Sequence, residues 1–185
     1  VEDLVESHIE LGITHHFDET AKLQPTWNKL IRILLASEGQ VPTTEQVRDY
    51  QRTSLGRLSG DNCLTDLLPL PSPSTDRWLY GEHSNLPYLI DREAYKRACL
   101  APRIAHLRQR ISEHRPRVVI FYGFSYREHW QQIAGVEFRR ESDVYVGHNP
   151  ASLFVITRHP VAKGVTNDYF HQVGKKISEY IRQTA

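Results

Sequence analysis

Two apolar runs constrain the fold of this chain more than any other feature. Arg117-Val-Val-Ile-Phe-Tyr122 ends at Gly123, and Leu153-Phe-Val-Ile-Thr157 runs into His159-Pro160. A continuous apolar run of this length is typical of a strand in a sheet that is covered on both faces. Segments with helical spacing lie between and around the two runs, so the pattern favours an α/β protein.

Five segments carry apolar residues at helical spacing. Most of them begin at a residue whose side-chain oxygen can cap the first turn, and two begin with the spacing of a capping box. The boxes pair Thr43 with Gln46 and Ser125 with Glu128. The predicted helices run from Thr26 to Gly39, from Thr43 to Gly56, from Asp91 to about His114, from Ser125 to about Ala134, and from Phe170 to Ile181.

A further strand is predicted over Asn62–Leu70, a short apolar segment that runs into the proline-rich turn Pro69–Ser74. Residues 71–90 lack periodicity and indicate a long ordered loop, and residues 136–146 indicate a short hairpin or edge strands. Strand and helix then alternate along the chain. This order predicts a three-layer α/β/α fold with a mostly parallel central sheet.

The composition of the chain limits which binding sites and which cellular compartment we expect. The formal net charge is +1, so a surface that binds phosphate must be a local patch. The two cysteines, Cys63 and Cys99, indicate a reducing compartment and cannot supply a four-cysteine iron–sulfur or zinc site. No apolar run approaches the length of a membrane span. We therefore expect a cytoplasmic protein with no cofactor and no membrane partner.

The chain begins at Val1 and contains no methionine. We infer that its N-terminus has been cut, processed or lost. The remaining 185 residues are long enough for one domain with a real core. We therefore expect a single domain over residues 1–185 that lacks part of its N-terminus.

A histidine lies two residues beyond the second apolar run, in the corner His159-Pro160, before a short polar loop and the last helix. In open α/β sheets, ligands bind just beyond the carboxyl ends of the strands. The protonation of a histidine can be tuned near neutral pH. His159 is therefore a candidate catalytic residue on position alone.

Several segments, in their order along the chain, together resemble the uracil-DNA glycosylase superfamily. The segments are Pro25-Thr26-Trp27, Cys63-Leu-Thr-Asp66-Leu-Leu-Pro69 with the Pro-Ser-rich run after it, Arg115-Pro-Arg-Val-Val-Ile-Phe-Tyr-Gly123, and His159-Pro160 with its loop and helix. The resemblance implies a glycosylase-like fold, DNA as the partner, and hydrolysis of the N-glycosidic bond of uracil or another damaged base.

The resemblance also implies roles for individual residues. His159 would stabilise negative charge on the departing base, and Asp66 stands where the family uses an asparagine to read the base. A carboxylate donates a hydrogen bond only when protonated, so we expect Asp66 to read a different base edge. The residues expected to contact the base beside Asp66 are Trp78, Tyr122, Gly123, Phe124 and Pro160.

Two further roles complete the expected site. The family's first catalytic motif is not recognisable in this chain, and Asp18 is the nearest candidate for positioning the attacking water. Lys163, Gly164 and Asn167 lie in the loop and helix start after His159, where ammonium and amide groups can contact DNA phosphates.

Three alternatives stay open. His159 and Asp66 could instead brace a turn and cap a loop. The first catalytic motif is not recognisable, and Asp66 stands in place of the family's asparagine. Both departures from the family pattern also suit a protein that binds nucleic acid or nucleotides without catalysis. Finally, His15, His16 and Asp18 have the spacing of metal ligands, which suits a metal-dependent hydrolase that also uses His159.

Overall fold

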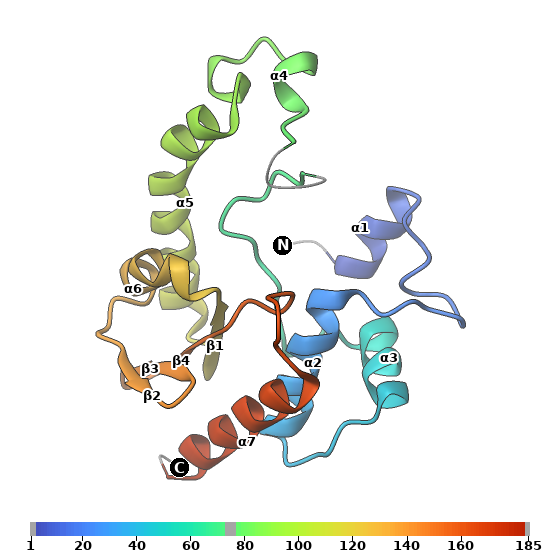
Figure 1. Ribbon diagram of the computed structural model, residues 1–185, viewed down its shortest axis with the longest axis vertical. Helices are drawn as coiled ribbons and strands as arrows, with labels where there is room; N and C mark the ends of the chain where they lie inside the picture. The colour runs from blue at the N-terminus through green and yellow to red at the C-terminus, as the bar shows by residue number, and fades with distance from the viewer. Residues whose placement is uncertain (1–2, 73–76, 184–185) are drawn as a thin grey trace. The chain divides into compact units, whose positions relative to one another are not determined.

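The computed structural model describes residues 3–72 and 77–183, and about half of the chain is helical. It divides into two compact units. The first unit combines Val1–Leu64 with Thr157–Ala185, and the second is Thr65–Ile156. Figure 1 shows that the first unit is built from helices and that the second contains the sheet. Asp66 and His159, the two central candidates of the sequence, therefore belong to different units.

The first unit is formed by two separate stretches of the chain and contains four helices among its described residues. They are α1 (Leu4–Glu10), α2 (Pro25–Ser37), α3 (Thr44–Thr53) and α7 (Asn167–Gln183). Sequence periodicity predicted the last three, and α1 was missed because it is only seven residues long. The capping box of α3 is confirmed, since the Thr43 and Gln46 side chains each bond the other's backbone amide.

The close approach of α2 and α7 organises this unit. Gly174 of α7 is buried against α2, and a Cβ atom added there would lie 2.5 Å from both the Ala36 Cβ and the Ile33 carbonyl oxygen. Only glycine leaves room for the two backbones to meet at this distance. Of the apolar stripe predicted for α7, Phe170, Val173 and Ile177 are buried and Ile181 is half-buried.

The second unit contains helices and one small sheet. Its elements are α4 (Tyr80–His83), η1 (Pro87–Leu89), α5 (Arg92–His114), β1 (Val118–Tyr122), η2 (Phe124–Tyr126), α6 (Arg127–Ala134), β2 (Arg139–Glu141), β3 (Val144–His148) and β4 (Leu153–Thr157), with the last residue of β4 at the boundary between the units.

The prediction of a mostly parallel three-layer sheet is wrong. The sheet is small and mixed, and its strand order is β1-β4-β3-β2. β3 pairs antiparallel with both β2 and β4. The loops explain this, because only a few residues join these strands and a parallel connection needs a dozen or more. β1 and β4 are separated by α6 and the β2–β3 hairpin, so only this pair has a connection long enough to run parallel.

The predicted strand over Asn62–Leu70 is also wrong, because this segment forms no strand in the structure. The Asn62 side chain ties the chain to the end of α3, accepting from the Gly56 amide at 2.7 Å and donating to the Ser54 carbonyl at 3.1 Å. Pro69 and Pro71 follow and have no N–H for a strand ladder. The loop predicted over 71–90 contains α4 and η1, and Pro73 and Ser74 lie outside the described residues.

The other local predictions for this unit have mixed outcomes. Asp91 caps α5, since its carboxylate accepts from the Ala94 amide at 2.7 Å. The hairpin predicted over 136–146 is confirmed as β2 and β3, although β3 continues to His148. The capping box expected at Ser125 is wrong, because η2 occupies this position and α6 begins after Tyr126 without a side-chain cap.

The core of the second unit lies between the sheet and the two helices α5 and α6 (Figure 1). Phe121 of β1 stacks on Trp130 of α6, with ring centroids 4.9 Å apart, and Phe154 of β4 is fully buried beside them. Leu107 completes the contact from α5. This packing fixes the carboxyl end of β1, where Tyr122, Gly123 and Phe124 lie.

The longest helix, α5, has 23 residues and continues through Pro102. Most of its residues are exposed or half-buried, and only Tyr95 and Leu107 are buried. Across the described parts of the chain, no helix combines the length and the apolar character needed to cross a membrane.

Candidate functional site

The carboxyl end of β1 is held rigidly. Gly123 ends the strand with a φ of 90°, which favours glycine, and its carbonyl accepts from the Trp130 indole N–H at 3.1 Å. The next residue, Phe124, packs edge-on against Tyr145 at 5.2 Å between ring centroids. The turn therefore holds the backbone of Tyr122 and Phe124 in a fixed position.

Asp66 lies on an extended segment that is anchored to α5. The Arg103 guanidinium donates to the Asp66 backbone carbonyl at 3.0 Å, and Leu67 packs against the core of the second unit. Although part of Asp66 is exposed, neighbouring atoms exclude water from its carboxyl and raise its pKa, and the charge of Arg103 opposes this only partly. Among the described residues, the Asp66 carboxylate makes no hydrogen bond.

Asp66 and Tyr122 are neighbours within the second unit. Burial raises the pKa of the Tyr122 phenol, and the negative charge of Asp66 raises it further. The phenol therefore stays protonated near neutral pH and remains a hydrogen-bond donor. These two polar groups beside a fixed glycine turn can bind a planar polar molecule.

His159 lies in the first unit, two residues beyond β4. Its ring Nδ1 accepts from the Val161 amide at 3.4 Å, and its carbonyl accepts from the Ala162 amide at 3.0 Å. Burial lowers the pKa of His159, so the neutral ring dominates at neutral pH. When Nδ1 accepts, the ring proton sits on Nε2, which makes that nitrogen a donor. Pro160 is fully buried and fixes the corner.

The residues expected to contact phosphate surround the start of α7. Lys163 and Gly164 are exposed, and Gly164 has a φ of 79° with open space around it. Thr166 accepts from the Tyr169 amide at 3.2 Å and caps the helix. The Asn167 side chain accepts a hydrogen bond from the Lys29 ammonium, so it is already engaged within the first unit.

Asp18, the candidate for positioning water, lies on the exposed loop between α1 and α2. Its carboxylate accepts from the Thr20 amide at 2.9 Å and from the Thr20 hydroxyl at 3.1 Å. This is a local turn in which the side chain holds its own backbone. Asp18 therefore has a structural role in this loop.

The histidines near Asp18 pack with aromatic residues. His16 donates through Nδ1 to the Lys22 carbonyl at 2.8 Å, and its ring meets Trp27 edge-on at 5.5 Å. His15 lies against His16, with ring centroids 4.1 Å apart. Over residues 3–72 and 77–183, no three His, Cys, Asp or Glu side chains are arranged to share a metal ion.

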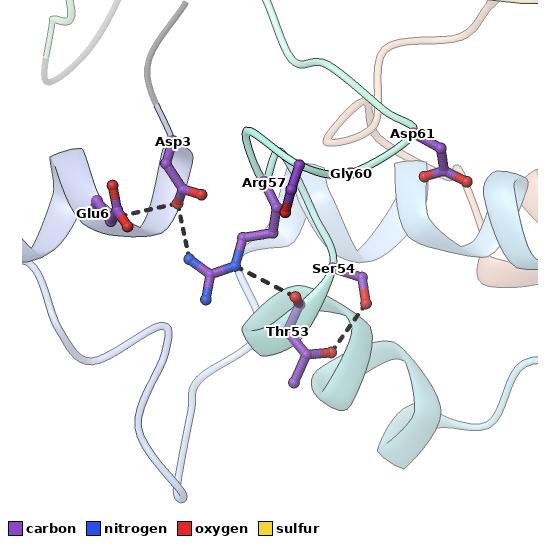
Figure 2. Close-up of a pocket in the computed structure, with 8 residues that line it drawn as sticks. Asp3, Glu6, Thr53, Ser54, Arg57, Gly60 and Asp61 are labelled. Atoms are coloured by element: carbon purple, nitrogen blue, oxygen red, sulfur yellow. Dashed lines mark hydrogen bonds and ion pairs between the residues drawn. The ribbon is translucent and has the colours of Figure 1, made fainter.

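Sequence reasoning missed a cavity of about 710 Å³ in the first unit. Figure 2 shows Arg57, from the turn after α3, reaching toward Asp3 at the start of α1. The two groups form an ion pair at 2.8 Å. A hydrogen bond from the Leu58 amide, together with Arg57, lowers the pKa of Asp3 to about 2. Because 53 residues separate the partners, only the N-cap position of Asp3 was readable from the sequence.

The cavity itself offers little for catalysis. Its walls carry the Asp3–Arg57 pair, two further carboxylates and several hydroxyls, and Figure 2 shows Asp61 apart from the ion pair. The pair is satisfied, so neither member is poised to transfer a proton. We interpret this region as a clasp that joins α1 to the end of α3, supported by the Leu4 amide donating to the Gly56 carbonyl at 3.0 Å.

Comparison with known proteins adds no assignment. No protein-family model, no curated protein and no solved structure matches the chain. The function must therefore be argued from the residues of the chain itself.

Proposed function

We propose that the protein hydrolyses the N-glycosidic bond of uracil or another damaged base in DNA. The observation that carries the proposal is the Asp66–Tyr122 pair beside the Gly123 turn, at the carboxyl end of β1. Ligands bind at such strand ends in α/β proteins. A base that has left the DNA stack offers a flat ring for Phe124 and polar edge atoms for Asp66 and Tyr122.

His159 has a role of its own in this proposal. It lies two residues beyond the end of β4. A neutral imidazole that donates from Nε2 can stabilise the negative charge that develops on a carbonyl oxygen of the departing base. The proposal assigns this charge stabilisation to His159, and the rate of base release by His159 variants tests it.

The proposed reaction balances without a further reactant. The bond between the sugar C1′ and the base nitrogen breaks, and its electron pair leaves with the base. Water adds its oxygen to C1′, and the proton that this water loses ends on the released base. Lys163 and the amides at the start of α7 would hold a neighbouring phosphate while this occurs.

The direct test is base release from DNA. We expect purified protein to release uracil or another altered base from an oligonucleotide panel, and His159→Ala to slow release by about 100- to 1000-fold, as for other lost charge-stabilising donors. His106→Ala, which replaces an exposed histidine on α5, is the matched control and should keep full activity. Robust release by folded His159→Ala would end the assignment of His159.

Asp66 determines which base edge is read in this proposal. An ionised carboxylate only accepts hydrogen bonds, whereas an amide both donates and accepts. Asp66→Asn should therefore change the preferred base on the same panel and favour uracil, which presents both a donor and an acceptor. An unchanged order of preference would remove Asp66 from base recognition.

One observation favours a second function, binding of nucleic acid or nucleotides without catalysis. The Asp18 carboxylate is occupied by Thr20, so no described residue of the N-terminal segment is assigned to position water. This alternative expects the oligonucleotides to bind with no base released. Detection of any enzyme-dependent release, abolished in His159→Ala, would exclude it.

A further inference from the structure

A second cavity lies within the second unit, between α5 and the end of α6. Its volume is about 330 Å³, at the small end of the range for sites that bind small molecules. Both helices contribute side chains to the core of this unit, which holds the two walls in place (Figure 1). Six residues line it, and we call it the Arg108 cavity: Arg108, Gln131, Gln132, Gly135, Val136 and Glu137.

Arg108 brings a positive charge to this cavity. A Cβ atom added at Gly135 would lie 3.4 Å from its guanidinium Nη2, so the guanidinium rests against the turn that ends α6. None of the residues in the described ranges accepts a hydrogen bond from Arg108. The C-terminal end of a helix favours a nearby cation, which explains the position of Arg108 but leaves five N–H donors without an acceptor.

Glu137 brings the opposite charge to the same cavity. One of its carboxylate oxygens accepts from the Gln131 side-chain amide at 2.8 Å. This bond positions the carboxylate, and because Gln131 is neutral the negative charge stays in place. Within the described parts of the chain, Glu137 forms an ion pair neither with Arg108 nor with Arg139, which follows two residues later.

The two charges are held about one helical turn apart. Arg108 rests at Gly135, and Glu137 is held by Gln131, four residues earlier along α6, which is a rise of about 6 Å. The other acidic residue of α6, Glu128, lies seven residues before Gly135, about 10 Å along the axis. Opposite charges that line one cavity without forming an ion pair leave room for a ligand that carries both.

We propose that the Arg108 cavity binds a free α-amino acid. The ligand carboxylate accepts two hydrogen bonds from the planar guanidinium, which suits this geometry. The ligand ammonium donates to the second carboxylate oxygen of Glu137. Half-buried Val136 gives apolar contact to the ligand side chain, and the exposed Gln132 amide adds a donor and an acceptor. An ion of a single sign would leave one charge of the cavity unpaired.

This site is separate from the proposed base site. The Gly123 turn and η2 precede α6, the cavity lies at the other end of α6, and eight helical residues, about 12 Å, separate them. Arg108→Gln should therefore release bases at the wild-type rate. If the wild type releases no base, the glycosylase proposal fails while binding of an amino acid still supports the cavity.

The test titrates each common L-α-amino acid into isotope-labelled protein and follows the backbone amides of Gly135 and Glu137 by nuclear magnetic resonance. We expect at least one amino acid to bind with a dissociation constant below about 1 mM. For each amino acid that binds, the N-acetyl derivative lacks the positive charge and the carboxamide derivative lacks the negative charge. Both derivatives should bind at least about tenfold more weakly, because each loses hydrogen bonds to a charged group.

Variants of the two charged residues locate the site. Arg108→Gln and Glu137→Gln should each weaken binding of the amino acid by about 10- to 100-fold. The matched controls are Arg97→Gln and Glu128→Gln, which remove the same charges at exposed positions outside the cavity and should bind as the wild type does. Thermal unfolding confirms that all four variants fold.

Three results would overturn the proposal. The first is that no amino acid binds, or that the control variants lose as much affinity as the cavity variants. The second is that a derivative with a single charge binds as tightly as its parent, which would indicate a site for an ion of one sign. The third is that Arg108 and Glu137 stabilise each other in a double-variant unfolding cycle while no amino acid binds, which would indicate an internal ion pair.

Discussion

Asp3 in the first unit and Asp66 in the second carry the same carboxyl group in opposite surroundings. The Asp3 carboxylate accepts four hydrogen bonds, from three backbone amides and from Arg57. Asp66 accepts none from the described residues, and burial raises its pKa where bonding lowers that of Asp3 to about 2. A satisfied carboxylate holds the fold together, whereas an unsatisfied one beside an aromatic turn is available to a ligand.

The largest expected effect distinguishes the structural role of Asp3 from the proposed ligand-binding role of Asp66. Asp66→Ala should weaken binding of the released base by about 10- to 100-fold, the loss expected for hydrogen bonds to a charged group. Its thermal stability should not fall. Asp3→Ala should do the reverse, lowering the unfolding temperature while base release by the folded protein continues. Calorimetry measures the unfolding temperature of both variants, and a base-binding assay measures their affinity. If both variants lost stability, the contrast between Asp3 and Asp66 would be contradicted.

The pH dependence of stability should differ between the two residues. Folding lowers the pKa of Asp3 from 3.8 to about 2, so its carboxylate stabilises the protein above pH 3.8 and that contribution is lost as pH falls toward 2. Denaturant unfolding of the wild type should therefore lose stability across this window. Asp3→Asn should not show this loss of stability at low pH. An identical dependence of stability on pH in both proteins would show that Asp3 does not form the clasp.

A smaller effect of the opposite sign is expected at Asp66. Because burial raises its pKa, the ionised form present at neutral pH is disfavoured in the folded protein, and this penalty disappears at low pH. Asp66→Asn has no charge to desolvate and should be slightly more stable at neutral pH. Chemical denaturation at pH 7 checks this, and a clear loss of stability would mean that the carboxylate has a structural partner.

The smallest effect is expected at Glu6, which lines the same cavity as Asp3 and makes no side-chain bond among the described residues. Glu6→Gln should change the free energy of unfolding by no more than about 0.5 kcal/mol. It is the matched control for Asp3, because it tests whether bonding or mere position in the cavity matters. If Glu6→Gln lowered the free energy of unfolding as much as Asp3→Asn does, position in the cavity would matter more than bonding.

Local signals in the sequence predicted local structure well. Thr43 and Asp91 cap their helices because a side-chain oxygen beside a free amide is an interaction within one turn. The strand predicted over Asn62–Leu70 failed for two reasons. The Asn62 amide bonds groups at the end of α3, which is not a local signal, and Pro69 has no N–H for a strand ladder, which is one. The short loops before and after β3 indicate that it runs antiparallel to its neighbours. The prediction of alternating strands and helices did not take these loops into account.

The candidate site was predicted in part. Tyr122 and Gly123 followed from the end of an apolar strand, which is a pattern that sequence carries directly. The proximity of Asp66 to Tyr122 depends on the route of the chain between Thr65 and Leu70, and the resemblance supplied it where periodicity did not. The clasp between Asp3 and Arg57 depends on packing between segments far apart in the chain, which no single-sequence pattern encodes.

The proposal that the Asp66–Tyr122 pair binds a base is tested most directly by nuclear magnetic resonance. A short uracil-containing oligonucleotide is titrated into isotope-labelled protein while the signals of Asp66 and Tyr122 are followed. We expect both to shift with one common dissociation constant, and Asp66→Ala to weaken the response at Tyr122. Shifts at neither residue, or two unrelated constants, would contradict base binding at this end of β1 and with it the glycosylase function.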